Sequence, residues 1–185
     1  MGKSHDLATI ATDGLPTLEV DTIKNTSGTT GLTIDSSGFI KPKVVAFQAF
    51  HDAALTLTNG LESTFQLDTT VIDPAGIVDL ANNRIAITAA TAGLYWLSFV
   101  CRLGSSAPPR QVVYIKVNGA EKLMAEENSG ASGSSGSQSV MTSGLLNLVA
   151  GDLITYHVYH NHGSNRDIEH YAAASRVEGY RIGTA

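Results

Sequence analysis

The sequence contains little cysteine and little charge. Cys101 is the only cysteine among 185 residues, so no disulfide can form within the chain and the fold must be stabilised by packing. Its neighbours Phe99, Val100 and Leu103 are apolar, and we expect Cys101 to be a buried, inert thiol. Charged residues make up 16%, and the net charge of -5 comes without a basic cluster. This excludes the positive surface that binds phosphate backbones, so we expect no nucleic acid partner.

Long apolar runs are also missing. No segment approaches the roughly 20 apolar residues that span a bilayer. The N-terminus lacks the apolar stretch of a signal peptide. We therefore expect no membrane insertion and no signal peptide, and an extracellular position would require another route, such as release of an assembled particle by lysis.

Catalytic motifs are absent as well. Neither Gly-x-Ser-x-Gly nor His-Glu-x-x-His occurs. Asp68, Asp73 and Asp79 lie in a turn-rich stretch, where Asp commonly accepts hydrogen bonds from the backbone. A calcium ion held by these oxygens is the alternative, although their spacing fits no EF-hand loop. The sequence therefore predicts no enzyme and no cofactor, apart from the metal considered below.

What the chain does contain is typical of β-structure. The 18 glycines and many Ser and Thr residues favour short strands joined by turns. In 111–117, Val113, Ile115 and Val117 share one face, and the following Asn118-Gly119 predicts a hairpin. The spacing predicts an all-β sandwich or jelly roll of about eight to ten strands. The strand candidates are 44–50, 64–67, 84–88, 94–103, 111–117, 139–149, 153–160 and 172–182.

The N-terminal part differs from this pattern. Residues 1–15 are polar without a sustained period, and we expect them to order only against a partner. Residues 16–43 contain brief alternating runs between turns, too thinly apolar to bury a face unaided. We interpret 16–43 as a stalk in which neighbouring chains complete the packing. A hairpin folded back on the domain 44–185 is the alternative.

Several segments resemble one known family in collinear order. Residues 93–99, Gly-Leu-Tyr-Trp-Leu-Ser-Phe, are similar to its Gly-x-Tyr-x-Phe-Ser segment. Residues 143–154 resemble its Ser-Gly-x-x-x-Leu-x-x-Gly-Asp-x-Val run, which is the most specific match. Segments 46–49, 113–119 and 175–180 resemble further strands. The family is that of the globular head of complement subcomponent C-one-q and its tumour-necrosis-factor-like relatives.

The resemblance implies a ten-stranded jelly roll, residues 44–185, that assembles as a homotrimer. Family members in animals usually follow a collagen stalk, but Gly at every third position is absent here. The run 25–38 instead looks like shaft segments of bacteriophage structural proteins. The resemblance thus implies a trimeric tail or head fibre on the virion surface. Residues 1–15 would dock to another virion protein, 16–43 would form the shaft, and the knob would bind a host surface glycan or protein. The alternative is a protein that decorates or stabilises the capsid or tail and binds no receptor.

Histidines are concentrated near the C-terminus. Along a strand, His160 and His162 point to the same side, and a three-fold axis would bring three such pairs together as six nitrogen ligands for a metal ion. The resemblance to phage fibres supports this expectation, because trimeric phage fibres bind metal ions through such histidine pairs. The alternative is a polar loop of unliganded histidines whose protonation loosens the loop or the trimer.

Aromatic residues suggest where recognition takes place. Tyr159 and Tyr171 flank the histidine segment and, with His157, are the candidates for binding a ligand such as a sugar. Tyr95 and Trp96 occupy opposite faces of one strand, so at least one faces away from the core and is available to pack across a subunit boundary.

Overall fold

The chain divides into two compact units, Met1–Lys43 and Val44–Ala185. The computed structural model describes residues 22–24, 30–34, 36–42, 44–104, 109–128 and 137–183. The predicted anchoring tail 1–15 lies outside these residues, and the predicted shaft 16–43 is described in part. The roles of both segments therefore stay predictions.

The N-terminal unit contains one small antiparallel sheet in the order β1-β2-β3. Its strands are short, β1 (Thr22–Lys24), β2 (Thr30–Ile34) and β3 (Ile40–Pro42). Phe39 and Ile40 remain 71% and 63% exposed. Three strands of this length bury little apolar surface by themselves.

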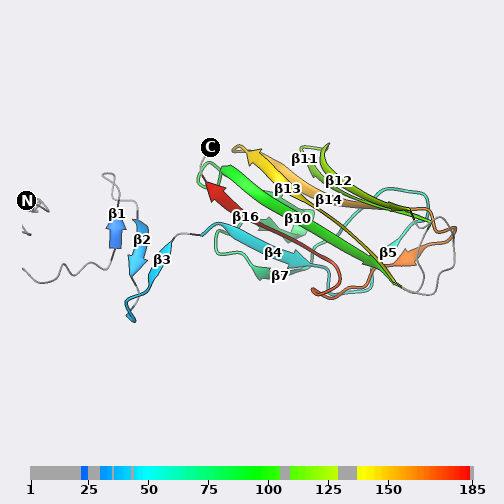
Figure 1. Ribbon diagram of the computed structural model, residues 1–185, viewed down its shortest axis with the longest axis horizontal. Helices are drawn as coiled ribbons and strands as arrows, with labels where there is room; N and C mark the ends of the chain where they lie inside the picture. Colours follow the sequence, from blue (N-terminus) through cyan, green and yellow to red (C-terminus); the bar gives the residue numbers. More distant parts are fainter. Residues whose placement is uncertain are drawn as a thin grey trace, which may run out of the picture. The chain divides into compact units, whose positions relative to one another are not determined.

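The second unit, the head, is a sandwich of two antiparallel sheets that lie as two layers in Figure 1. The first, here the β10 sheet, has the order β13-β10-β16-β4-β7. Along β10 the odd-numbered residues face the core, whereas Trp96, Val100 and Arg102 face outward. Its strands are β4 (Ala46–Phe50), β7 (Thr69–Ile72), β10 (Gly93–Leu103), β13 (Gln138–Leu148) and β16 (Arg176–Gly183).

The second sheet, here the β14 sheet, has the order β12-β11-β14-β9-β8, and β6 also pairs with β14. The predicted hairpin at Asn118-Gly119 is confirmed, because both residues have the positive φ of a mirror-image turn, 52° and 79°. A small pair, β5 (Thr56–Leu57) with β15 (Arg166–Asp167), and the 3-10 helix η1 (Leu80–Asn82) complete the head. The strands of the β14 sheet are β6 (Ser63–Thr64), β8 (Val78–Asp79), β9 (Arg84–Ala86), β11 (Arg110–Val117), β12 (Ala120–Asn128) and β14 (Leu153–His160).

Aromatic rings fill the space between the two sheets. The Phe99 ring lies 5.1 Å from Phe65 and 5.4 Å from Tyr156, centroid to centroid, at the tilted and edge-on angles that aromatic pairs prefer. Cys101 is fully buried, as expected, and burial raises the pKa of its thiol to about 12. The prediction of an all-β sandwich is confirmed.

Five described strands of the head were not predicted, namely β5, β7, β8, β12 and β15. Strand β12 is exposed or half-buried at every position, so it shows no alternation of apolar and polar residues. Strand β7 is short and is likewise mostly exposed. Within the part of the chain that the structure describes, no helix is long and apolar enough to cross a membrane.

Candidate binding face

The outward side of the β14 sheet gathers most of the candidate residues. The core side of β14 buries Tyr156, Val158 and His160, so Thr155, His157 and Tyr159 face outward. On the neighbouring β11, Lys116 is opposite Thr155 and Tyr114 is opposite His157. We call these five residues, Tyr114, Lys116, Thr155, His157 and Tyr159, the binding face.

His157 lies at the centre of a polar network on this face. Its Nδ1 is 2.9 Å from Glu62 Oε1, and its Nε2 is 3.0 Å from the Thr155 hydroxyl. The Lys116 ammonium donates to the same Glu62 oxygen at 2.6 Å. Burial lowers the pKa of His157, and Lys116 acts in the same direction, while Glu62 and Glu121 oppose them. His157 is therefore held by partners on both ring nitrogens.

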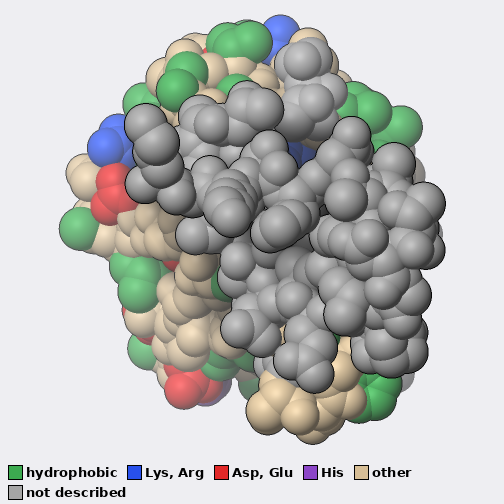
Figure 2. Space-filling view, turned by 90° about the vertical axis from the view of Figure 1, so that its left-hand side faces the viewer, with side chains coloured by type: hydrophobic (Ala, Val, Ile, Leu, Met, Phe, Trp, Pro, Cys, Tyr) green, Lys and Arg blue, Asp and Glu red, His purple; other side chains and the backbone are tan. Residues whose placement is uncertain are grey.

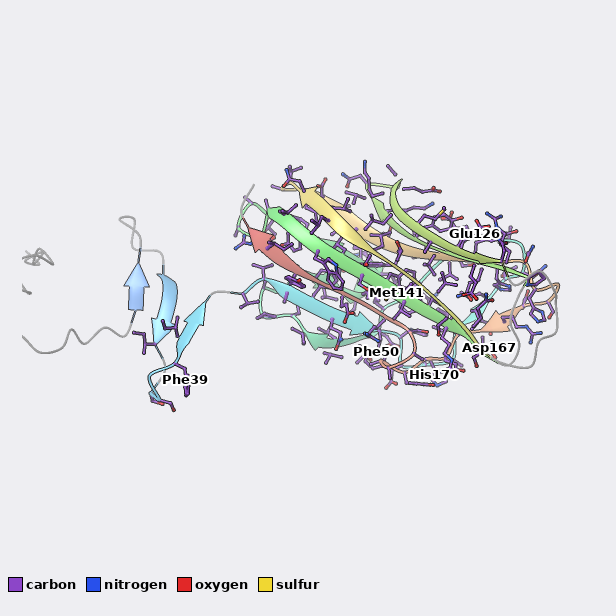
Figure 3. The ribbon with its side chains drawn as sticks, viewed as in Figure 1. Phe39, Phe50, Glu126, Met141, Asp167 and His170 are labelled. Atoms are coloured by element: carbon purple, nitrogen blue, oxygen red, sulfur yellow. The ribbon has the colours of Figure 1, made fainter. Side chains whose placement is uncertain are left out.

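The two tyrosines of the binding face are each accompanied by a cation. The Arg110 guanidinium lies 5.2 Å from the Tyr159 ring centroid, and Lys116 Nζ lies 5.4 Å from that of Tyr114. Arg110 also donates to Glu126 on β12 at 2.7 Å. Glu126 is labelled in Figure 3. The tyrosine rings are thus held in defined positions, which lowers the entropy cost of stacking a ligand on them.

A pocket of about 470 Å³ adjoins the binding face. It lies where β14 changes partner, because β9 pairs with Leu153 and Ile154, β6 pairs with His157 and Val158, and Thr155 falls between the two pairings. Thr64, Arg84, Lys116, Thr155 and His157 line it, together with the Asn118-Gly119 turn. The binding face and the pocket share Lys116, Thr155 and His157.

The structure brings together only two of the three residues that the sequence predicts to bind a ligand. His157 and Tyr159 share the binding face, but Tyr171 does not belong to it. Tyr171 is 49% exposed, and its hydroxyl donates to Glu169 Oε2 at 2.6 Å. Glu169 in turn pairs with Arg102 on the outward side of the β10 sheet. Tyr171 is therefore linked to the opposite sheet.

His160 and His162 do not form the expected pair along a strand, because β14 ends at His160. The His160 side chain is fully buried, its Nε2 donates to the Leu57 carbonyl at 3.3 Å, and its Nδ1 accepts from the His162 backbone at 3.4 Å. Arg166 Nη2 lies 2.6 Å from His162 Nε2. Among the described residues no group of three His, Cys, Asp or Glu could hold a metal ion. The expected geometry is wrong, and metal binding stays an untested prediction.

Two of the three aspartates, Asp73 and Asp79, serve turns, as predicted. Asp68 does not, because it accepts from the Asp52 backbone at 2.8 Å and lies 3.0 Å from His51 Nδ1, both well away along the chain. Asp73 accepts hydrogen bonds from the Ile77 and Val78 backbone, both at 2.9 Å. Asp79 accepts from the Asn82 backbone at the start of η1 and pairs with Arg84 at 2.8 Å. All three carboxylates therefore already have hydrogen-bond partners within the head.

Sequence reasoning missed Glu62, Thr64 and the position of Tyr114 and Lys116 beside His157 and Thr155. The alternation of 111–117 already predicts that Tyr114 and Lys116 share a face. It does not show which strand lies beside them, and the predicted strand 64–67 neither reaches Glu62 nor shows that this segment pairs with β14. Pairing of β11 and β6 with β14 creates the site, and pairing is a tertiary property.

The head has a two-sheet jelly-roll fold like that of solved tumour-necrosis-factor-like and C-one-q domains. No family model and no curated protein matches the sequence. The chain is similar in structure to Eiger TNF from S. frugiperda, with a TM-score of 0.63 at 10% identity, covering 77% of this chain and 94% of that one. Murine APRIL matches with a TM-score of 0.57 at 12% identity, covering 76% and 100%. The globular domain of zebrafish complement 1qA protein gives 0.51 at 13%, covering 76% and 99%.

Proposed function

We propose that this chain is a phage virion structural protein, a homotrimeric tail or head fibre whose knob attaches to the host cell surface. The observation that carries the proposal is the contrast between the two outward faces of the head. The face of the β10 sheet is apolar and suits self-assembly. The binding face on the opposite sheet is polar and aromatic and suits recognition.

The apolar face extends across three neighbouring strands. Trp96 on β10 is opposite Leu145 on β13 and Tyr180 on β16, and the Trp96 and Tyr180 rings are 5.5 Å apart. Met141, labelled in Figure 3, is 59% exposed on the same face, and Leu145 is 57% exposed. In Figure 2, hydrophobic side chains (green) are visible at several separate places around the edge of the view. Monomeric proteins rarely expose an apolar patch like the one around Trp96, so we assign it to contact with two further copies of the chain.

The N-terminal unit supports the fibre rather than a collagen-stalked protein. Its strands are too short to bury Phe39 and Ile40, both of which are exposed. Parallel copies of the unit would cover them. In the proposed arrangement, residues 16–43 form the trimeric shaft, and residues 1–15 dock to another virion protein at the particle surface.

A decoration or stabilising protein of capsid or tail is the second candidate. It is favoured by the mutual pairing of polar groups around the binding face, where Glu62 pairs with Lys116 and His157, and Arg110 pairs with Glu126. Side chains that satisfy each other leave fewer groups for a receptor. The separation of Tyr171 from Tyr159 points the same way.

Two measurements test the proposal. Light scattering of the full chain should give the mass of a trimer at micromolar concentration, and a monomer would contradict both candidates. The purified trimer should also block adsorption of the particle to its host cells. Normal adsorption by particles that lack the protein would reject the attachment role and support decoration.

A further inference from the structure

We propose that the pocket beside Thr155 binds one uncharged hexose unit of a cell-surface polysaccharide. This inference rests on the proposed attachment function and names the ligand of the same face. It is carried by the size of the pocket, by the polar groups that line it and by the balance of charge around it.

The pocket has a structural origin in the sheet itself. Strand β14 pairs with β9 over Leu153 and Ile154 and with β6 over His157 and Val158, so the outer surface is interrupted at Thr155. The resulting volume of about 470 Å³ exceeds that of one sugar ring and falls within the range of small-ligand sites.

The lining offers hydroxyls and spare donors. Thr64 and Thr155 each contribute a hydroxyl, which both donates and accepts. The Lys116 ammonium has three donors, of which Glu62 accepts one at 2.6 Å, while Glu121 lies 3.8 Å away. Arg84 directs its Nε to Asp79 at 2.8 Å, which leaves the donors of both Nη atoms. Such a mixture complements the hydroxyl groups of a sugar.

The charge around the pocket favours an uncharged ligand. Each lining cation is already paired with a carboxylate, Lys116 with Glu62 and Arg84 with Asp79. An anionic sugar would meet these carboxylates without an unpaired cation to receive it, and a cationic sugar would meet Lys116 and Arg84. Paired ions still form strong charge-assisted hydrogen bonds to neutral hydroxyls.

The pocket also continues into the aromatic part of the binding face. Lys116 lines the pocket and lies over Tyr114, and His157 lines the pocket opposite Tyr114. Tyr159 follows two residues further along the same side of β14. A polysaccharide with one unit in the pocket can therefore place its next unit on Tyr114 and Tyr159.

The test is an NMR titration of the full-length trimer with the methyl glycosides of glucose, galactose and mannose, and with galacturonic acid and glucosamine as charged counterparts. At least one neutral glycoside should bind saturably, with a Kd of about 1 mM, and shift the resonances of Thr64 and Thr155. Thr155→Val should weaken this binding about tenfold, the effect of one hydrogen bond. Thr70→Val, which removes an exposed hydroxyl on β7 of the other sheet, should leave it unchanged.

Three outcomes would overturn the inference: no neutral glycoside binds, the charged sugars bind as tightly, or the two Thr variants behave alike. Should Thr155→Val fail to assemble, Lys116→Gln serves in its place, with Lys122→Gln, at an exposed position of β12 outside the pocket, as its control. A trimer that blocks adsorption but binds none of these sugars rejects the hexose and leaves the attachment function intact. A monomer rejects the attachment function itself.

Discussion

The indole of Trp96 and the phenol ring of Tyr180 lie 5.5 Å apart on the outward side of the β10 sheet, across adjacent strands. Tyr95, the preceding residue, is fully buried on the other side of β10. The expectation that Tyr95 and Trp96 take opposite faces is thereby confirmed. The aromatic pair marks the centre of the apolar face that we assign to the trimer.

Two exposed methionines on opposite sheets test that assignment. Met141 on β13 is 59% exposed and Met124 on β12 is 54% exposed. Met141→Glu should dissociate the trimer, because it places a charge in an apolar contact. Met124→Glu should keep the trimer mass in light scattering. Equal masses for the two variants would contradict a trimer contact at the β10 sheet.

Gly179 is required by close packing inside the head. A Cβ added there would lie 2.7 Å from Leu97 Cδ2 and 2.8 Å from the Phe47 ring. Gly179→Ala should therefore lower the free energy of unfolding by about 1 to 3 kcal/mol. Gly183→Ala, whose Cβ would meet no atom within 4 Å, is the control and should change it by less than about 0.5 kcal/mol. Denaturant unfolding at matched protein concentration measures the free energy of unfolding of both variants. An unchanged value for Gly179→Ala would show that Leu97 and Phe47 can move aside without cost.

Acid should destabilise the head through His160. Burial lowers the pKa of its imidazole, and His162 and Arg166 act in the same direction, while the bond to the Leu57 carbonyl opposes them. The unfolded chain therefore takes up this proton at a higher pH than the folded chain does. The contribution of neutral His160 to stability is fully present above the ordinary histidine pKa of about 6.5. As the pH drops below this value, the free energy of unfolding falls by at most about 1.4 kcal/mol per pH unit for one proton.

The variant His160→Gln isolates this effect. Glutamine keeps a donor for the Leu57 carbonyl but cannot be protonated in this range. Between pH 8 and pH 5 the free energy of unfolding should fall less steeply in the variant than in the wild type. Identical slopes would show that His160 does not carry the acid sensitivity.

Cys101 should be chemically silent in the folded protein. Its side chain is fully buried, and burial raises the pKa of the thiol to about 12, so almost no thiolate exists at pH 8. Iodoacetamide should label one thiol per chain in guanidinium chloride and almost none in native buffer. Rapid labelling of the native protein would contradict this position in the core.

Part of the fold could be predicted because alternation survives in strands with one buried face. Strands β10, β11 and β14 each alternate between apolar core residues and outward residues, and all three were predicted. Strand β12 was missed, because its nine residues are exposed or half-buried and its position depends on pairing with β11.

The candidate site, too, could be predicted from the sequence only in part. The outward placement of His157 and Tyr159 follows from the period of β14. The sequence alone also determined the solitary thiol, the turn roles of Asp73 and Asp79, and the Asn118-Gly119 hairpin, because these depend on local geometry or on counting. Which strands lie beside His157, that Tyr171 joins the opposite sheet, and that β14 ends at His160 with its ring in the core were decided only by the tertiary structure. The physical reason is that strand pairing joins residues far apart in the chain, and the period of one strand contains no information about its neighbour.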